Sequence, residues 1–120
     1  MVLAAGFGGQ LVAQSVSTSQ IEGTVTDPTG GAIPGATVVA VATGTGFAHA
    51  TTTGPRGGFV LSNLPVGGYS LKVTAKGFVT YKQTGIILQV ATNPTVNVHL
   101  KVGSESQVVE VSANAAMVET

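Results

Sequence analysis

The residues of this chain that could do chemistry are few, and its two histidines come first. The sequence contains His49 and His99 and no cysteine. A zinc site needs at least three ligands, held by a second shell of hydrogen bonds. His99 lies between Asn97 and Lys101 on the polar face of an alternating segment, which indicates a solvated imidazole. His49 lies in a threonine-rich segment without a neighbouring carboxylate. The histidines therefore predict no metal site, and nothing else in the sequence predicts a cofactor.

The carboxylates likewise predict no catalytic pair. General acid–base chemistry and glycoside hydrolysis need carboxyl groups placed close to the reacting bond, whereas those of this chain are scattered over turns and segment ends. The glycine-rich loops lack the Lys-Ser or Lys-Thr pair of a phosphate-binding loop, and they precede strands rather than helices. We therefore expect no enzyme activity. The carboxylates are Glu22, Asp27, Glu105, Glu110 and Glu119.

The composition excludes two classes of partner. Only 8% of the 120 residues are charged, five basic residues balance five acidic ones, and the formal net charge is +0. Binding to nucleic acid or to anionic lipid needs clustered Lys and Arg, so we expect neither partner. A chain of this length forms one domain and buries roughly 60% of the surface of its unfolded form, which is enough for one core.

The elements that must position these residues are β-strands, and the clearest one lies within residues 67–78. Tyr69, Leu71 and Val73 share one face of this segment and Lys72 lies on the other, as in a half-buried antiparallel strand. Many residues are Val or Thr, which favour strands, and the 17 glycines mark turns. No segment shows a sustained 3.6-residue apolar period, so we expect no helix.

Seven short segments have the pattern of β-strands, and the turn residues between them recur at the spacing that is typical of a sandwich. They predict an all-β fold, a seven-stranded antiparallel β-sandwich with flexible tails. Residues 36–42 are apolar on both faces and predict an inner strand, and the last alternation places Val102 inside. The predicted strands are residues 20–26, 36–42, 48–53, 58–61, 69–75, 80–90 and 95–102. The predicted core is Ile21, Val25, Val38, Phe59, Leu64, Tyr69, Leu71, Val73, Phe78, Val96, Val98 and Leu100.

Two turns predict a backbone conformation that favours glycine. Residues 27–30 match a type I turn, with Asp27 accepting a local hydrogen bond and Gly30 leaving the turn in the left-handed region. The second turn precedes the clearest strand. We expect a positive φ at Gly30 and at Gly67 or Gly68, where a Cβ atom would be costly.

The N-terminal residues lie outside the predicted sandwich, which spans residues 20–102. Residues 1–14 are mostly small and apolar and are typical of the end of a signal peptide, although no Lys or Arg precedes the apolar run. A disordered Gly/Ala-rich tail is the alternative. A transmembrane helix needs about 20 apolar residues, and no segment reaches that length. Residues 15–19 are expected to form a linker.

The C-terminal residues 103–120 are interpreted as a connector toward a further domain. Within them, residues 108–111 resume the apolar pattern and predict one short strand. That strand pairs either with an edge of the sandwich or with a domain beyond this chain, and the sequence leaves both alternatives open. Because the rest of the segment offers little apolar surface, a chain trimmed after Gly103 is expected to keep nearly the same melting temperature.

Five motifs occur in order along the chain. They are Glu22-Gly23-Thr24-Val25-Thr26-Asp27, Ile33-Pro34-Gly35-Ala36-Thr37-Val38, Gly58-Phe59, Leu64-Pro65-Val66-Gly67-Gly68-Tyr69 and Ala75-Lys76-Gly77-Phe78. Together they resemble the carboxypeptidase regulatory-like domain, which implies a transthyretin-like sandwich. Relatives often carry an Asp and an Asn where this chain has residues 54–57, so no cation is expected at that turn. The structural positions of the motifs and core are Pro34, Phe59, Leu64, Pro65, Gly67, Tyr69, Leu71, Val73, Gly77 and Phe78.

The segment from Val109 to Thr120 is also similar to the connector that follows this domain in Oar-like TonB-dependent outer-membrane receptors. In those receptors the domain is a periplasmic extension ahead of a plug and a transmembrane barrel. The resemblance implies a protein exported to the periplasm or outer membrane of a Gram-negative bacterium. Its partners would be other protein domains of a larger receptor.

Carbohydrate binding is the alternative function, because sandwiches related to this family include starch-binding modules. Sugar rings stack on exposed aromatic side chains, and the chain has 4 Phe, 2 Tyr and no Trp. The core pattern accounts for Phe59, Tyr69 and Phe78. Phe47 and Tyr81 remain as candidate ligand contacts, provided that both are exposed on one side of the fold. The favoured function is a non-enzymatic structural or interaction module that presents sheet edges and loops to a partner.

Overall fold

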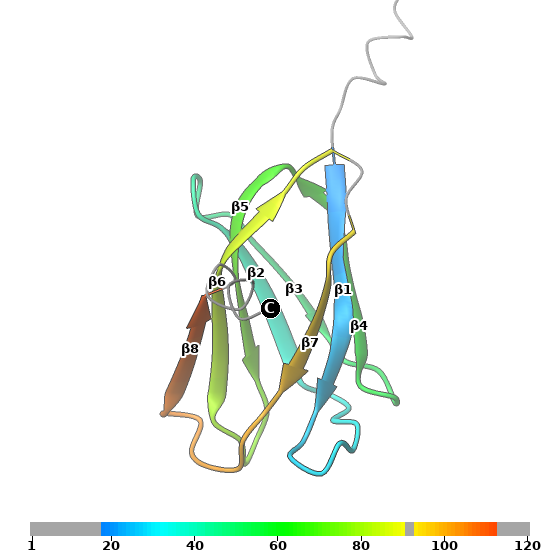
Figure 1. The fold of residues 1–120 in the computed structure, drawn as a ribbon, viewed down its shortest axis with the longest axis vertical. Coiled ribbons are helices and arrows are strands. Elements are labelled where there is room, and N and C mark those ends of the chain that lie inside the picture. Colours follow the sequence, from blue (N-terminus) through cyan, green and yellow to red (C-terminus); the bar gives the residue numbers. More distant parts are fainter. Residues whose placement is uncertain (1–17, 91–92, 113–120) are drawn as a thin grey trace, which may run out of the picture.

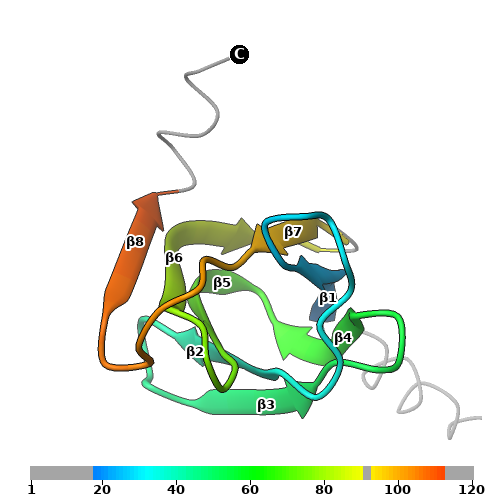
Figure 2. The same ribbon diagram turned by 90° about the horizontal axis from the view of Figure 1, so that it is seen from below.

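The computed structural model describes residues 18–90 and 93–112, and these form a sandwich of two β-sheets. One sheet has three strands in the order β4-β1-β7 and the other has five in the order β3-β2-β5-β6-β8. The two sheets pack face to face (Figures 1 and 2), as expected from the alternating pattern. The strands are β1 Thr18–Thr26, β2 Thr37–Ala42, β3 Ala48–Thr52, β4 Gly58–Pro65, β5 Gly67–Thr74, β6 Thr80–Leu88, β7 Thr95–His99 and β8 Val108–Ser112.

The predicted all-β sandwich is confirmed, with two differences in its strands. The described residues form eight strands rather than seven, and two of the pairs are parallel: β1 with β7 and β6 with β8. Both differences follow from the path of the chain. After β6 it crosses to the other sheet and runs alongside β1, and after β7 it crosses back, so that β8 runs in the same direction as β6 (Figure 1).

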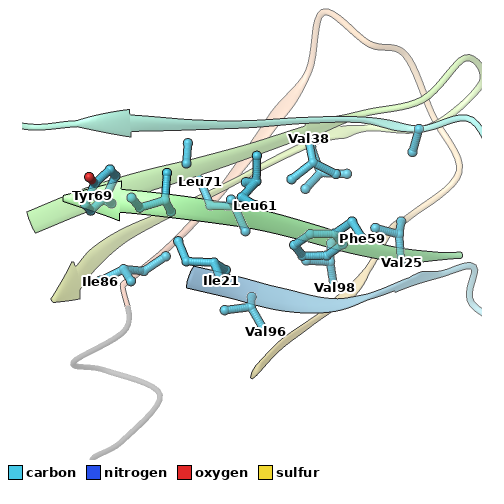
Figure 3. Packing of buried hydrophobic residues seen from close by; sticks show 14 of the residues in the cluster. Ile21, Val25, Val38, Phe59, Leu61, Tyr69, Leu71, Ile86, Val96 and Val98 are labelled. Carbon is cyan, nitrogen blue, oxygen red and sulfur yellow. The ribbon is translucent and has the colours of Figure 1, made fainter. Parts of the chain in front are cut away.

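The core lies between the sheets and contains nearly all of the predicted residues (Figure 3). Phe78 is the exception, because it is only half-buried and packs against the edge of the cluster. The alternation identified most of the strand residues but missed Ile33, which enters from a loop, and several apolar residues inside the predicted strands. The core residues that were not predicted are Ile33, Ala36, Ala40, Leu61, Ile86 and Leu88.

Several strand boundaries differ from those expected. β1 begins at Thr18, so Thr18 and Ser19, which were predicted to lie in a linker, belong to the strand, and Ser19 is buried. β2 is an inner strand between β3 and β5, as predicted, but Val39 and Val41 on its outer face are only half-buried. The N-terminal segment 1–14 and the end of the connector lie outside the described residues.

Val102 is the clearest error of the alternation, because its side chain is 72% exposed instead of buried. β7 ends at His99, and the Leu100 N–H donates to the Thr26 carbonyl oxygen at 2.8 Å. Beyond that point the chain leaves the sheet and begins to cross to the other one. Val102 forms only an isolated bridge with Phe78. An alternating pattern therefore continued in the sequence for one step after the strand had ended.

The predicted turn geometry is confirmed at both sites. Gly30 has φ 91° and Gly67 has φ 137°, whereas Gly68 does not have a positive φ. At the first turn, the Gly30 N–H donates to the Asp27 carbonyl oxygen at 2.9 Å. Such conformations are readily accessible only without a Cβ atom. No helix in the described part of the chain is long and apolar enough to cross a membrane.

Candidate interaction surfaces

The two histidines lie on different sheets and have different surroundings. His99 is exposed on β7, and its Nδ1 atom lies 2.7 Å from the Thr26 hydroxyl oxygen. His49 is half-buried on β3 opposite Ala40, and its buried Nε2 atom has no hydrogen-bond partner among the described residues. The His49 ring meets the Phe47 ring edge to face, with 4.8 Å between centroids. No three His, Asp or Glu residues gather into a possible metal site within residues 18–90 and 93–112.

Asp27 is occupied by its own turn. Its carboxylate accepts hydrogen bonds from the Thr29 hydroxyl at 2.6 Å, the Gly31 N–H at 2.8 Å and the Thr29 N–H at 2.9 Å. These donors, the Thr29 hydroxyl first and then the Gly31 N–H, lower the pKa of Asp27 because they stabilise the charged carboxylate. All three donors belong to residues 29–31, so the Asp27 carboxylate stabilises its own turn.

The two aromatic residues predicted to contact a ligand do not lie on one surface. Phe47 is 61% exposed in the loop between β2 and β3. Tyr81 is half-buried and faces the interior of the sandwich, because it lies opposite the buried Val73 on β5. Its hydroxyl donates to the Gln83 Oε1 atom at 2.9 Å, and burial raises the pKa of Tyr81.

Strand register explains why these two rings are apart. The Ala42 N–H donates to the Phe47 carbonyl oxygen, and Ala42 lies opposite Tyr69 near the start of β5. Tyr81 lies opposite Val73 near the end of β5, four residues further along the strand. A strand rises about 3.3 Å per residue, so the rings lie near opposite ends of the sheet. The platform that would stack a sugar on both rings is therefore not formed.

Tyr81 instead lines a cavity of about 240 Å³ between the sheets, on the side where β7 faces β8. The cavity lies beneath Val109 and Val111, two residues of β8 that lie opposite Tyr81 and Gln83 in the parallel pairing. Ligand sites for small molecules usually measure about 300–1,000 Å³, so this space is small. Its lining residues are Val79, Tyr81, His99, Leu100, Lys101, Val109 and Val111.

A larger but open depression of about 560 Å³ lies on the outer face of the three-stranded sheet. Its polar side chains include Glu22, Thr24 and Asn97, and the Thr24 hydroxyl donates to the Asn97 Oδ1 atom at 3.1 Å. No exposed aromatic ring borders it. Without such a ring it lacks the stacking surface on which the carbohydrate alternative depends.

β8 forms one edge of the five-stranded sheet and, among residues 18–90 and 93–112, pairs with β6 alone. The connection that leads to it is ordered by hydrogen bonds: the Thr80 N–H donates to the Gln107 carbonyl oxygen, and the Thr80 hydroxyl donates to the Glu105 carbonyl oxygen. Figure 2 shows β8 projecting away from the other strands. The sequence left open whether this strand pairs with an edge of the sandwich or with a further domain. In the structure, residues 108–112 pair with β6 of the sandwich.

The family model for the carboxypeptidase regulatory-like domain matches residues 20–101. The match spans the sandwich from β1 to the end of β7. The chain belongs to the carboxypeptidase regulatory-like domain family. β8 lies beyond the matched residues, so it is an addition to the part of the domain that the family model describes. Among curated proteins, the comparison finds no significant match.

The motif residues of this regulatory-like domain shape its turns. The Tyr69 hydroxyl donates to the Pro65 carbonyl oxygen at 2.6 Å, which closes the Leu-Pro-Val-Gly-Gly-Tyr turn over Gly67. Gly77 has φ 88° in the turn between β5 and β6. Pro34 is exposed next to the buried Ile33.

Two further residues, Gly23 and Thr53, stabilise the packing of the regulatory-like domain, although the sequence did not predict them as structural positions. A Cβ atom at Gly23 would overlap the Val96 carbonyl oxygen, so glycine allows β1 and β7 to approach. The buried Thr53 hydroxyl donates to the Ile33 carbonyl oxygen at 2.6 Å and accepts from the Ala36 N–H at 2.8 Å. The sequence contains one local indication of the role of Gly23, because a glycine inside a predicted strand can mark a place where another backbone approaches closely.

Solved structures with similar folds come from several kinds of protein. The Bacillus anthracis TIE protein has a TM-score of 0.59 at 21% identity, over 72% of this chain and 17% of that one. The 3-chlorocatechol 1,2-dioxygenase of Rhodococcus opacus 1CP has 0.58 at 10% identity, over 74% and 61%. A type II cohesin–X-dockerin complex from Acetivibrio cellulolyticus has 0.57 at 16% identity, over 71% and 58%. The chain spans less than two thirds of each, and the likeness shows the fold alone.

Proposed function

We propose that this domain is a non-enzymatic interaction module and that it acts by strand addition at the free edge of β8. The observation that carries the proposal is the position of β8, which pairs with β6 on one side and has no strand on its other side within the described part of the chain. An unpaired edge offers N–H and C=O groups to an incoming strand. The alternating Val108, Glu110 and Ser112 side chains on the outer face would contact the partner's side chains.

The opposite edge of the same sheet is less suited to this role. β3 lies beside β4 at a corner of the sandwich (Figure 2), and the two are joined by a tight turn in which the Gly54 N–H donates to the Gly58 carbonyl oxygen. β8 has no comparable neighbour, as Figure 2 shows. A partner strand therefore meets fewer obstacles at β8 than at β3.

The wider context of the proposal is an exported receptor. The family membership and the similarity of the C-terminal segment to the connector of Oar-like TonB-dependent receptors support a place ahead of a plug domain, in the periplasm or at the outer membrane. Determining the coding sequence beyond Thr120 tests this context directly. A plug and barrel sequence is the expected result, and a stop codon directly after Thr120 would contradict it.

The mechanism can be tested with a synthetic peptide that copies residues 106–114 and serves as the probe strand. We expect the peptide, at millimolar concentration, to slow hydrogen exchange of alternate N–H groups of β8, because successive N–H groups of a strand point to opposite edges. The β3 amides serve as the internal control. Equal protection of β3, or no protection of β8, would contradict strand addition at β8.

Proline substitutions provide a matched pair of variants for the same experiment. Val109→Pro and Glu110→Pro remove neighbouring N–H groups, one directed toward β6 and the other toward the free edge. The variant that loses the inner N–H should have a lower melting temperature. The variant that loses the outer N–H should fold but no longer protect β8 in the presence of the peptide. Identical behaviour of both variants would speak against the proposed edge.

A further inference from the structure

One end of the sandwich carries exposed apolar side chains and no Asp, Glu, Lys or Arg. We call it the uncharged end and define it as residues 42–48, 63–69 and 86–90. It is the end at which β1 begins, and the turns between β2 and β3 and between β4 and β5 lie there together with the end of β6 (Figure 1). Its exposed apolar side chains are Phe47 (61%), Val66 (42%), Ile87 (63%) and Val90 (63%).

The charged residues of the described part lie elsewhere. Those of the turns are at the opposite end, where β1 and β5 finish and β8 starts (Figure 1). The others lie within strands. The charged residues between strands are Asp27, Arg56, Lys76, Lys101 and Glu105. Those within strands are Glu22, Lys72, Lys82 and Glu110. An apolar surface that gathers residues from three segments and excludes all charge is typical of a surface that another apolar group covers.

The uncharged end contains a depression of about 190 Å³ with a glycine-rich floor. Phe47 and Val66 line it from two different loops, and a Cβ atom at Gly68 would lie 3.7 Å from the Ile87 Cδ1 atom, so Ile87 borders the same surface. A volume below about 300 Å³ is smaller than a small-molecule site. It suits one or two aliphatic side chains of a peptide.

Backbone hydrogen bonds join the loops of the uncharged end to each other and to the neighbouring strands. The Gly46 N–H donates to the Ala42 carbonyl oxygen at 2.7 Å, and the Thr43 N–H donates to the Gly68 carbonyl oxygen at 2.9 Å. The Phe47 ring packs against the His49 ring at an interplanar angle of 85°. Phe47 is therefore presented to solvent by a hydrogen-bonded loop that rests against the neighbouring strand.

We propose that the chain's own N-terminal segment, residues 2–13, covers the uncharged end. This segment carries no charged side chain and is mostly apolar, and the surface that it would cover has the same character. Its sequence is Val2-Leu3-Ala4-Ala5-Gly6-Phe7-Gly8-Gly9-Gln10-Leu11-Val12-Ala13. It is also tethered at the right place. Thr18 lies opposite Pro65 in the pairing of β1 with β4, and Pro65 and Val66 line the depression.

The length of the tether permits this contact. Leu11 precedes Thr18 by seven residues, which can span roughly 23 Å when extended, and the depression begins next to the strand partner of Thr18. A short covalent tether holds its segment at an effective concentration in the millimolar range. Weak apolar contacts suffice at that concentration.

A single tryptophan can report on the contact, because the chain has no Trp. In the full chain with Leu11→Trp, we expect blue-shifted emission and slow quenching by acrylamide. Adding Phe47→Ser and Val66→Ser should shift the emission to the red and speed the quenching. Val60→Ser with Val102→Ser is the matched control, since both valines are exposed away from the uncharged end, and it should leave the emission unchanged. Circular dichroism checks that each variant remains folded.

Three results would overturn the proposal. The first is emission of a fully solvated tryptophan in the parent background. The second is a blue shift that survives Phe47→Ser with Val66→Ser. The third is a blue shift that grows with protein concentration, which would make a second copy the occupant. None of these results depends on the edge of β8, so the proposal can fail while strand addition at β8 holds.

Discussion

β7 and β8 are two five-residue strands with similar valine alternation, and both lie parallel to a neighbour. β7 buries Val96 and Val98 in the core, whereas β8 buries no side chain completely and leaves Val109 and Val111 half-buried. The hydrogen-bond ladders are alike, but an intramolecular hydrogen bond adds only about 0.5–1.5 kcal/mol to stability. A buried aliphatic side chain contributes about 1.5–3 kcal/mol. Burial, more than pairing, therefore decides which of the two strands is essential.

The strongest test of this comparison is Leu100→Ala, at the point where β7 ends. Leu100 is only 1% exposed and also lines the cavity beneath β8. Removing a buried leucine side chain should lower the free energy of unfolding by about 2–5 kcal/mol, a large share of the stability of a small domain. Urea denaturation measures the loss, with Leu71→Ala as a second fully buried site. A loss below about 0.5 kcal/mol, within the usual range for surface positions, would remove β7 from the core.

The next largest effect is expected at Gly23, where β1 and β7 approach each other. A Cβ atom there would overlap the Val96 carbonyl oxygen, so Gly23→Ala must push the strands apart. Overpacking of this kind typically costs about 1–3 kcal/mol. Gly44→Ala is the control, because a Cβ atom there meets nothing within 4 Å. Equal melting temperatures for the two variants would show that the β1–β7 contact is looser than described.

The local pattern of the sequence explains why much of the fold could be predicted. Alternation identified Leu71, Val73 and Val98 because each faces the interior of a half-buried strand. It failed at Val102, where the chain leaves the sheet before the alternation stops. It could not place Phe47 and Tyr81 relative to each other, because their distance depends on the register of β2, β5 and β6. Local sequence does not determine which edge β8 joins.

A third test removes β8 by trimming the chain after Gly103. The sequence alone predicts nearly unchanged stability, but β8 pairs with β6 along five residues, and Val109 lies opposite Tyr81. We now expect a loss of about 1 kcal/mol, which lowers the melting temperature by about 4–8 °C for a domain of this size. Differential scanning calorimetry gives the value. A drop as large as that of Leu100→Ala would make β8 as essential as β7, and the contrast between the strands would disappear.

The smallest effect concerns the ion pair that joins β8 to β6. The Lys82 Nζ atom lies 3.8 Å from the Glu110 Oε2 atom, and both side chains are substantially exposed to solvent. Exposed pairs of this kind contribute about 0.2–1 kcal/mol, and salt screens them. Glu110→Gln should therefore lower the free energy of unfolding by at most a few tenths of a kcal/mol, and the difference should vanish in high salt.

The control must account for a second lysine beside this ion pair. Lys72 on β5 lies directly opposite Lys82, so Glu110→Gln also leaves two like charges without a neighbouring carboxylate. A double-mutant cycle with Lys82→Met separates the pair from this repulsion. A coupling energy well above 1 kcal/mol would mean that charge, rather than burial, attaches β8 to the sheet.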